Sequence, residues 1–480
     1  MKSNLKSNLV YSVLGVVFNT IFPLITYPYV TRKLGVASLG EYNFYASTVA
    51  YMALVAGFGI SLHGTKLIGK CADNKDKYSQ VFGDLLTINL ILVGIVYVFA
   101  VFLMIFGAHY QNTKLFIITS ITILTECIGA EFIFVALERQ KFMLIRNVIF
   151  KIISLVCIFL FIKGEEDLLK YAGIMLLSTA GISITNIMAY KGLINWKSIH
   201  INYKDLVPYI MPLFQVFLMN LLIHYYGMMD VVVLGNMGSV EDVGYYSTAS
   251  KLYGLSYAFL ASTAIPLLPR ASYYLEKGLT AEYNGLIKKC YDIYVIFIVF
   301  ISFILFFYSE EIVTLVAGGA FANSSMPLKY FSLTLFFSSL CNCFIFQVFY
   351  PHDKAKWVLI SQVIGIGINV LLSILLIPLY SYNGAAIAFF VSYVFLFISM
   401  LITGRSIIPK FSGFRDLIKE TVALMLCIIT AILLRVTNVY FLFSICLCAL
   451  LYFIVGILTK NETLLYLTKI VINKFKGVHE

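Results

Sequence analysis

The sequence predicts an all-α polytopic membrane protein with about 14 transmembrane helices. Of its 480 residues, 60% are hydrophobic and 12% are charged, whereas about a quarter of the residues in soluble domains are charged. The hydrophobic residues also gather in runs of roughly 20, the length that an α-helix needs to cross about 30 Å of hydrocarbon. Lys and Arg concentrate in every second loop between these runs. We therefore expect a bilayer to be part of the solvent in which the chain folds.

The apolar runs follow one another along the whole chain. Lys2 and Lys6 precede the first run, which is longer than a signal-peptide core and lacks a small-residue cleavage site, so we expect it to remain as the first span. The nine cysteines lie mostly inside the runs, without the paired spacing of a zinc or haem site, and are expected to be small buried side chains. The predicted spans cover residues 8–31, 41–68, 80–107, 115–137, 142–162, 169–190, 207–235, 243–268, 287–308, 328–350, 357–380, 383–404, 415–435 and 438–459.

The distribution of Lys and Arg predicts the orientation of these spans. With a cytoplasmic N-terminus, 26 of the 35 Lys and Arg residues fall on the cytoplasmic side and 7 on the other, while Lys151 and Lys251 lie inside spans. Cytoplasmic loops carry the excess of positive charge, so both termini are expected in the cytoplasm. The net charge of +11 is then mainly a topology signal.

An internal repeat at an offset of about 200 residues divides the spans into two halves. Residues 39–42, read as LGEY, recur at 243–246 as VGYY, and the hairpin residues 132–134 and 141–145, read as FIF and KFMLI, recur at 344–346 and 356–360 as FIF and KWVLI. Chance similarity between apolar segments is the alternative. Because odd and even spans match in the same order, the halves are expected to be parallel six-helix repeats, related by a pseudo-two-fold axis along the membrane normal.

The repeat predicts four parts in the chain. Residues 1–195 form the N-terminal lobe and residues 196–410 the C-terminal lobe, each of six helices. Residues 411–460 add two further transmembrane helices outside the repeat. In residues 461–480, apolar residues alternate with Lys469, Lys474 and Lys476, which is typical of an amphipathic helix on the cytoplasmic leaflet.

Four charged residues of the fourth and fifth spans are expected to meet in pairs. If these spans form an antiparallel hairpin that turns near Gln140, Glu131 lies level with Arg146 and Glu126 lies level with Lys151. Ionisable groups at membrane depth cost several kcal/mol unless they are paired or hydrated, so they are candidate functional residues. The alternative is that the pairs only neutralise each other in a helix interface. The residues leave both interpretations open.

Further candidates come from the other half and from the first span. Asp230 lies about one turn from the outer end of the seventh span, and Lys251 lies about nine residues into the eighth. The cations in the spans favour a phosphate or an acidic sugar as substrate, through charge pairing and hydrogen bonds. We thus take Arg146, Lys151, Lys251 and Arg32 as candidates for substrate binding, and Glu126, Glu131 and Asp230 as candidates for coupling or ion pairing.

Prolines inside two spans predict bent helices. Pro23 and Pro28 interrupt the hydrogen-bond ladder of the first span, and Pro266 does so near the end of the eighth. Kinked helices are common passive features of helix bundles. The other interpretation is a bend that changes between inward-open and outward-open states.

No motif indicates a nucleotide, metal or other cofactor site. Residues 64–71, read as GTKLIGKC, have the glycines and lysine of a phosphate-binding loop, but Cys71 stands where Ser or Thr is required and no strand precedes it. No zinc-protease helix or nucleophile elbow is present in the sequence. We expect no cofactor, no metal and no nucleic-acid partner.

Four segments resemble the polysaccharide repeat-unit flippases of the O-antigen type, whose superfamily also contains multidrug exporters and the peptidoglycan-precursor flippase. The resemblance covers the first 270 residues well and the remainder by hydropathy only. The segments are 23–40, read as PLITYPYVTRKLGVASLG; 57–64, read as GFGISLHG; 131–161, read as EFIFVALERQKFMLIRNVIFKIISLVCIFLF; and 230–235 with 244–249, read as DVVVLG and GYYSTA.

This resemblance implies a two-lobed bundle around a cationic cavity that works by alternating access. Its implied substrate is an undecaprenyl-diphosphate-linked oligosaccharide, which passes from the cytoplasmic to the outer leaflet of a bacterial inner membrane for O-antigen or capsule synthesis. A polysaccharide polymerase and a chain-length regulator are the implied partners, beside membrane lipids. The residues themselves supply the buried cations and the lack of a nucleotide site, but not the substrate.

Two other functions compete with this expectation. A cation-coupled multidrug exporter of the same superfamily usually needs an acidic residue in a first-lobe helix, and the first span has none. A membrane glycosyltransferase or polymerase needs a sizeable outer loop to hold its chemistry, whereas the longest one, residues 309–327, is mostly small and apolar. We therefore expect a transporter and not an enzyme.

Overall fold

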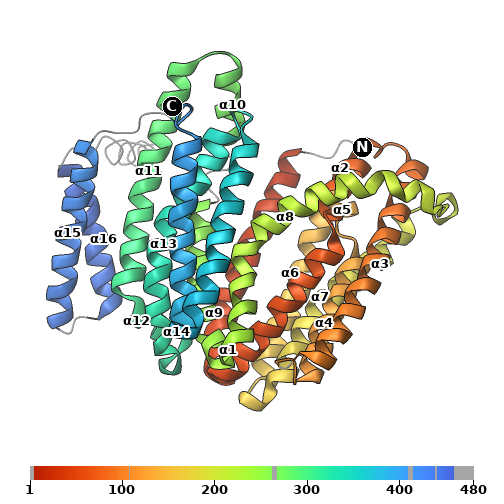
Figure 1. Ribbon diagram of the computed structural model, residues 1–480, viewed down its shortest axis with the longest axis horizontal. Helices are drawn as coiled ribbons and strands as arrows, with labels where there is room; N and C mark the ends of the chain where they lie inside the picture. The colour runs from red at the N-terminus through yellow and green to blue at the C-terminus, as the bar shows by residue number, and fades with distance from the viewer. Residues whose placement is uncertain (1–4, 108, 262–266, 409–413, 438–439, 459–480) are drawn as a thin grey trace. The chain divides into compact units, whose positions relative to one another are not determined.

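The computed structural model describes residues 5–107, 109–261, 267–408, 414–437 and 440–458 (Figure 1). Within these ranges every regular element is a helix, and no strand occurs. The predicted all-α class is therefore confirmed. Pro266 and the predicted tail at 461–480 lie outside the described residues.

The first eleven helices contain the predicted spans one to eight, and several breaks divide them. They are α1 (Leu5–Gly57), α2 (Ile60–Lys70), α3 (Lys75–Phe106), α4 (Thr113–Gly129), α5 (Phe132–Ala136), α6 (Gln140–Phe161), the 3₁₀ helix η1 (Glu165–Asp167), α7 (Leu168–Leu193), η2 (Trp196–Ser198), α8 (Tyr203–Met237) and α9 (Val240–Ala261).

The remaining helices contain the predicted spans nine to fourteen. They are α10 (Leu268–Glu276), α11 (Thr280–Phe307), α12 (Ser309–Ala317), η4 (Gly319–Ser324), α13 (Ser325–Phe344), the π-helix η5 (Ile345–Phe349), α14 (Ala355–Thr403), α15 (Phe414–Val436) and α16 (Phe441–Leu458).

Nine segments of the described chain are long and apolar enough to cross a membrane, and two shorter apolar helices follow at 423–436 and 441–455. Two of the nine, Ile21–Lys70 and Ala355–Thr403, each combine two predicted spans. A residue with positive φ divides each of them, Gly35 (φ 71°) in α1 and Ser381 (φ 49°) in α14. These breaks lie where the sequence predicts a turn between spans, and the total of 14 spans remains approximate.

The predicted fourth span is not one continuous helix. α4 ends at Gly129, because Ala130 adopts a left-handed conformation (φ 34°) and its N–H bonds back to Glu126 O and Cys127 O. The short helix α5 follows, and a second positive φ at Glu138 (56°) turns the chain into α6. The predicted span over 115–137 nevertheless matches a candidate membrane span at Thr113–Ala136, and its last part is a separate short helix.

The described residues fall into two compact units, and we describe each by itself. The first comprises residues 1–247 with 316–321 and 377–382, and the second comprises the rest. The division falls inside α9, whereas the sequence places a lobe boundary at residues 195 and 196. The predicted domain limits remain a prediction.

Each unit has its own buried core. In the first unit, side chains of α2, α3, α5 and α7 enclose Phe82, Ile133 and Tyr190. In the second, one cluster surrounds Phe344 and Phe349, and another joins α11 to α15 and α16 through Cys427 and Tyr452.

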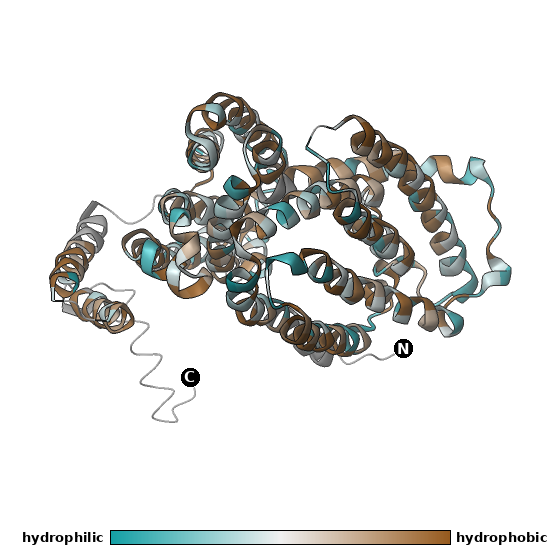
Figure 2. Ribbon diagram, turned by 90° about the horizontal axis from the view of Figure 1, so that it is seen from below, coloured by the Kyte–Doolittle hydropathy of each residue, from teal (hydrophilic) through white to brown (hydrophobic). Residues whose placement is uncertain are grey.

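Large apolar side chains also cover the outer faces of the helices. Val98, Phe106 and Leu160 are more than half exposed in the described structure, and Figure 2 shows hydrophobic residues along most of the helices. Lipid is the environment in which such surfaces are stable. Of the cysteines, Cys446 is exposed, contrary to expectation, whereas Cys127, Cys341, Cys343, Cys427 and Cys448 are buried as predicted.

Candidate functional site

The predicted pair of Glu131 and Arg146 forms. Arg146 Nη2, on α6, donates a hydrogen bond to Glu131 Oε1, just before α5. The two side chains differ in exposure, at 3% for Arg146 and 53% for Glu131. The carboxylate can thus keep part of its hydration, whereas the guanidinium depends on protein groups for its stabilisation.

Two aromatic rings complete the environment of Arg146. Its Cζ lies 5.4 Å from the ring centroid of Phe134 and 5.5 Å from that of Phe142, within the range of a cation–π interaction. No hydrogen-bond acceptor in the described structure reaches its Nε or Nη1. The geometry therefore favours a structural role for this pair, which ties the α5 segment to α6.

The second predicted pair does not form. Lys151 and Glu126 are both described, and no ion pair joins them. Lys151 instead donates a hydrogen bond to Asn19 Oδ1 of α1, with its ammonium 5.4 Å from the Phe22 ring centroid. Glu126 is exposed. The prediction that these residues lie level with each other assumed a straight antiparallel hairpin. The left-handed Ala130 ends α4, so this hairpin does not form.

The candidates near the predicted outer end of the seventh and eighth spans differ in exposure. Asp230 of α8 is 2% exposed, and Tyr246 Oη of α9 donates a hydrogen bond of 2.9 Å to its Oδ2. Lys251, also on α9, is exposed. An exposed cation can meet an anionic ligand, whereas the buried Asp230 is held within the α8–α9 interface.

Arg32 lies at the end of another helix. Its Nη1 donates hydrogen bonds to Pro28 O (2.7 Å) and to Val316 O (3.0 Å) in the last turn of α12. Carbonyls of a helix C-terminus lack intrahelical partners and carry partial negative charge, so a guanidinium stabilises them. Arg32 therefore caps α12, and its exposed face leaves room for a second role.

Threonines accompany both prolines of α1, where the sequence predicts bends. Thr26 Oγ1 donates to Phe22 O (3.0 Å), one residue before Pro23, and Thr31 Oγ1 donates to Tyr27 O (2.9 Å), one residue before Pro28. Hydroxyls that bond back to the preceding turn add to the bending that proline causes. Whether these bends change during function remains a prediction.

The glycines aligned by the sequence repeat meet each other. A Cβ on Gly40 would clash with Val240 O and lie 2.7 Å from Gly244 N, and a Cβ on Gly244 would clash with Val36 O. Each glycine thus lets the backbone of the other helix approach. Such a reciprocal contact between equivalent residues is typical of a two-fold relation. At these glycines the backbones of α1 and α9 are in direct contact within the first unit.

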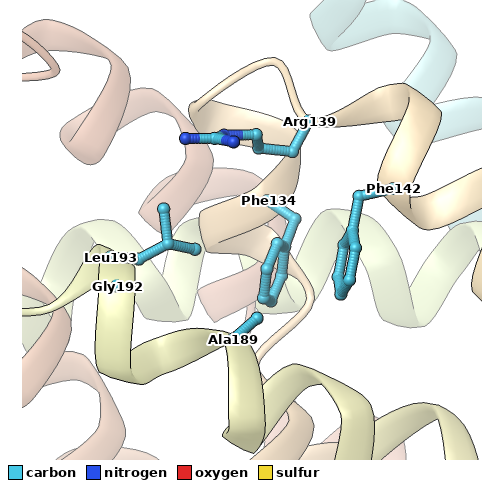
Figure 3. A pocket seen from close by; sticks show the side chains of 6 residues that line it. All are labelled: Phe134, Arg139, Phe142, Ala189, Gly192 and Leu193. Carbon is cyan, nitrogen blue, oxygen red and sulfur yellow. The ribbon is translucent and has the colours of Figure 1, made fainter.

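A cavity of about 220 Å³ was not foreseen from the sequence (Figure 3). The rings of Phe134 and Phe142 stand side by side in it, with Ala189 beneath them and Arg139 above. Gly192 and Leu193 at the end of α7 complete the lining. The cavity forms only where residues of three elements come together, which the sequence does not show. The hairpin motif at 132–145 was the one sequence feature that included some of its lining residues.

Comparisons with known proteins place these features in a family. The sequence model described as "Polysaccharide biosynthesis protein" matches residues 5–274, more than half of the chain. A protein of Escherichia coli (strain K12) named "Putative O-antigen transporter" is 25% identical over 363 residues, which are 74% of this chain and 86% of that protein. A protein of the same name from Shigella dysenteriae is 22% identical and covers 80% of this chain and 96% of its own length.

Solved structures resemble the whole fold. The lipid II flippase MurJ in an inward closed conformation superposes with a TM-score of 0.74 at 17% identity, covering 94% of this chain and 99% of that one. An inward-facing multidrug resistance MATE family transporter of the MOP superfamily gives a TM-score of 0.59 at 14% identity, covering 83% and 97%. At these identities the likeness establishes a shared polytopic fold.

Proposed function

The chain belongs to the polysaccharide biosynthesis protein family, and from this premise we propose that it is a flippase for a lipid-linked polysaccharide precursor. In detail, it carries an undecaprenyl-diphosphate-linked oligosaccharide from the cytoplasmic to the outer leaflet of a bacterial inner membrane, with both termini in the cytoplasm. The observation that carries the proposal is the family match over residues 5–274, together with two relatives that are named O-antigen transporters.

The charges of the described chain support an anionic substrate. Lys151 on α6 is half-buried and Lys251 on α9 is exposed, and a diphosphate is the ligand that such cations favour by charge and hydrogen bonding. The excess of Lys and Arg expected on the cytoplasmic face would attract the headgroup before it enters. Arg146 contributes through the position of α6, because its exposed fraction is only 3%.

The transport cycle that fits the fold is alternating access. The bends predicted at Pro23 and Pro28 of α1 and the close crossing of Gly40 and Gly244 would be places where helices change their packing. The polysaccharide polymerase and the chain-length regulator would act on the delivered substrate. The multidrug-exporter alternative rests on likeness of fold alone.

Deleting the gene should make complete lipid-linked repeat units accumulate on the cytoplasmic leaflet while surface polymer disappears. Synthesis continues in such a strain and only translocation stops. The measurement is extraction of lipid-linked oligosaccharides, with their leaflet determined by an impermeant oxidant of sugars. Incomplete repeat units would point to a transferase. Unchanged surface polymer with greater sensitivity to cationic dyes would point to a drug exporter.

Replacing Lys151 with alanine should abolish surface polymer at normal expression, because the substrate loses a cation that water cannot replace. Asn19→Ala is the matched control, since it removes the described partner of Lys151 and leaves the charge, and it should retain most activity. The double variant Glu126→Ala/Lys151→Ala should stay inactive. Recovery in the double variant would indicate an ion pair between these residues and would contradict a substrate role for Lys151.

A further inference from the structure

The cavity beside α5 combines an apolar wall with a cation. Phe134, Phe142, Ala189 and Leu193 supply the wall, and the Arg139 guanidinium lies over it (Figure 3). Arg139 is exposed and is the N-cap residue of α6, whose first turn has no acidic residue and no side-chain cap. A ligand that fits must therefore have an apolar part and an anionic group next to it.

More positive charge lies around the end of α7. Lys75 Nζ donates a hydrogen bond of 3.0 Å to the carbonyl of Gly192, which lines the cavity. Lys141 and Lys191 are exposed and adjoin the lining residues in sequence. All of these residues belong to the side that the distribution of Lys and Arg predicts to be cytoplasmic.

The surroundings of the cavity are those of a surface that faces lipid. Ile145 of α6 is 48% exposed and Met188 of α7 is 67% exposed, and Val135 beside Phe134 is 37% exposed. Val135 and Met188 adjoin lining residues in sequence, and Ile145 lies three residues after Phe142 on α6. An acyl chain is the apolar group that a membrane brings to such a surface.

The cavity differs from the place where the transported substrate is proposed to bind. Phe142 and Lys151 are nine residues apart on α6, which is two and a half turns, so they lie on opposite faces of the helix. Their contacts agree, because Lys151 meets Asn19 and Phe22 of α1, whereas Phe142 lies against Phe134 of α5 at 5.1 Å between ring centroids. A lipid in the cavity would not compete for Lys151.

We propose that this cavity binds an anionic phospholipid of the cytoplasmic leaflet, with its phosphate on Arg139 and an acyl chain against Phe134 and Phe142. Basic pockets between transmembrane helices at the cytoplasmic surface are sites of this kind. The planar guanidinium can present two parallel N–H groups to one phosphate, a fork geometry that the ammonium of lysine lacks. The bound lipid would join the α5–α6 turn to the end of α7, against the two aromatic rings that Arg146 also contacts.

Quenching of tryptophan fluorescence by lipids with brominated acyl chains tests the proposal. The chain has only two tryptophans, so Trp196→Phe/Trp357→Phe removes the background, and Phe142→Trp places one indole in the cavity lining. The aligned residue of the repeat is Trp357, so an indole suits this turn. The full-length protein is reconstituted with brominated phosphatidylglycerol or brominated phosphatidylcholine at equal mole fraction.

Quenching of the indole should show that the anionic lipid associates about fivefold more strongly than phosphatidylcholine. This factor corresponds to the attraction of about 1 kcal/mol between one Arg and an anionic membrane surface. Arg139→Ala should reduce this preference to about one. Lys141→Ala is the matched control, because it removes the same charge from the same turn without lining the cavity, and it should keep the preference. Leu193→Trp in the same background gives a second reporter if Phe142→Trp does not fold.

Three outcomes would overturn the proposal. Equal quenching by the two lipids would show that the cavity does not select anionic lipid. Equal losses in Arg139→Ala and Lys141→Ala would assign the effect to diffuse surface charge. Relief of quenching by a few mole per cent of a polyprenyl diphosphate would identify the substrate lipid as the occupant. None of these measurements involves transport, so they do not depend on the proposed flippase activity.

Discussion

Gly244→Ala and Gly40→Ala should each lower the free energy of unfolding by about 1–3 kcal/mol, the usual cost of overpacking, and should abolish surface polymer. The new Cβ meets backbone atoms, Val36 O in the first case and Val240 O in the second, and backbone cannot rotate away as a side chain can. α1 and α9 must separate instead. Thermal unfolding of the purified protein and complementation of the deletion strain measure the two effects.

Gly254→Ala is the control for this prediction. Gly254 also lies in α9, and no atom lies within 4 Å of the position of its Cβ. Alanine should there stabilise the helix by roughly 0.5–1 kcal/mol, because glycine is the poorer helix former. The two substitutions in one helix should thus have opposite signs. Equal losses of stability at Gly244 and Gly254 would contradict the close contact of α1 with α9.

Glu131→Gln should destabilise the protein more than Arg146→Met does. Without the carboxylate, a guanidinium that is 3% exposed loses its only hydrogen-bonded counter-charge in the described structure. Removing one partner of a fully buried pair costs about 3–5 kcal/mol, and the 53% exposure of Glu131 lowers the expected loss to roughly 2–3 kcal/mol. Arg146→Met leaves a carboxylate that water already reaches and an apolar side chain against Phe134 and Phe142, so about 1 kcal/mol is expected.

The double variant and a peripheral pair complete this test. Glu131→Gln/Arg146→Met should recover at least half of the loss seen in Glu131→Gln, because no buried charge remains. Lys170→Ala breaks an ion pair with Asp167 of 2.6 Å in which the lysine is 64% exposed, and it should cost no more than about 1 kcal/mol. Thermal unfolding in one detergent gives all four values. A larger loss in Arg146→Met than in Glu131→Gln would refute the argument from unequal burial.

Local patterns were sufficient for the class of the fold and for part of the candidate site. Apolar runs of membrane length predict helices whatever their neighbours are, because the backbone in lipid must satisfy its own hydrogen bonds. The turns near Gly35 and Ser381 were predicted as gaps between runs, and the structure has breaks there. The pairing of Glu131 with Arg146 could be predicted because both residues lie close to the turn between the two spans. Over so few residues, a deviation from ideal helix geometry shifts their relative positions only slightly.

Tertiary structure decided what depends on segments far apart in sequence. The left-handed Ala130 ends α4, so the prediction that Glu126 lies level with Lys151 fails. Lys151 instead bonds to Asn19 on α1, 132 residues away. The repeat aligned Gly40 with Gly244 by sequence, but only packing shows that the two helices touch there. The cavity at Arg139 likewise needs α5, α6 and α7 together. A sequence determines hydrogen bonding and burial along one helix, whereas the choice of partner for a side chain depends on how several helices share the same space.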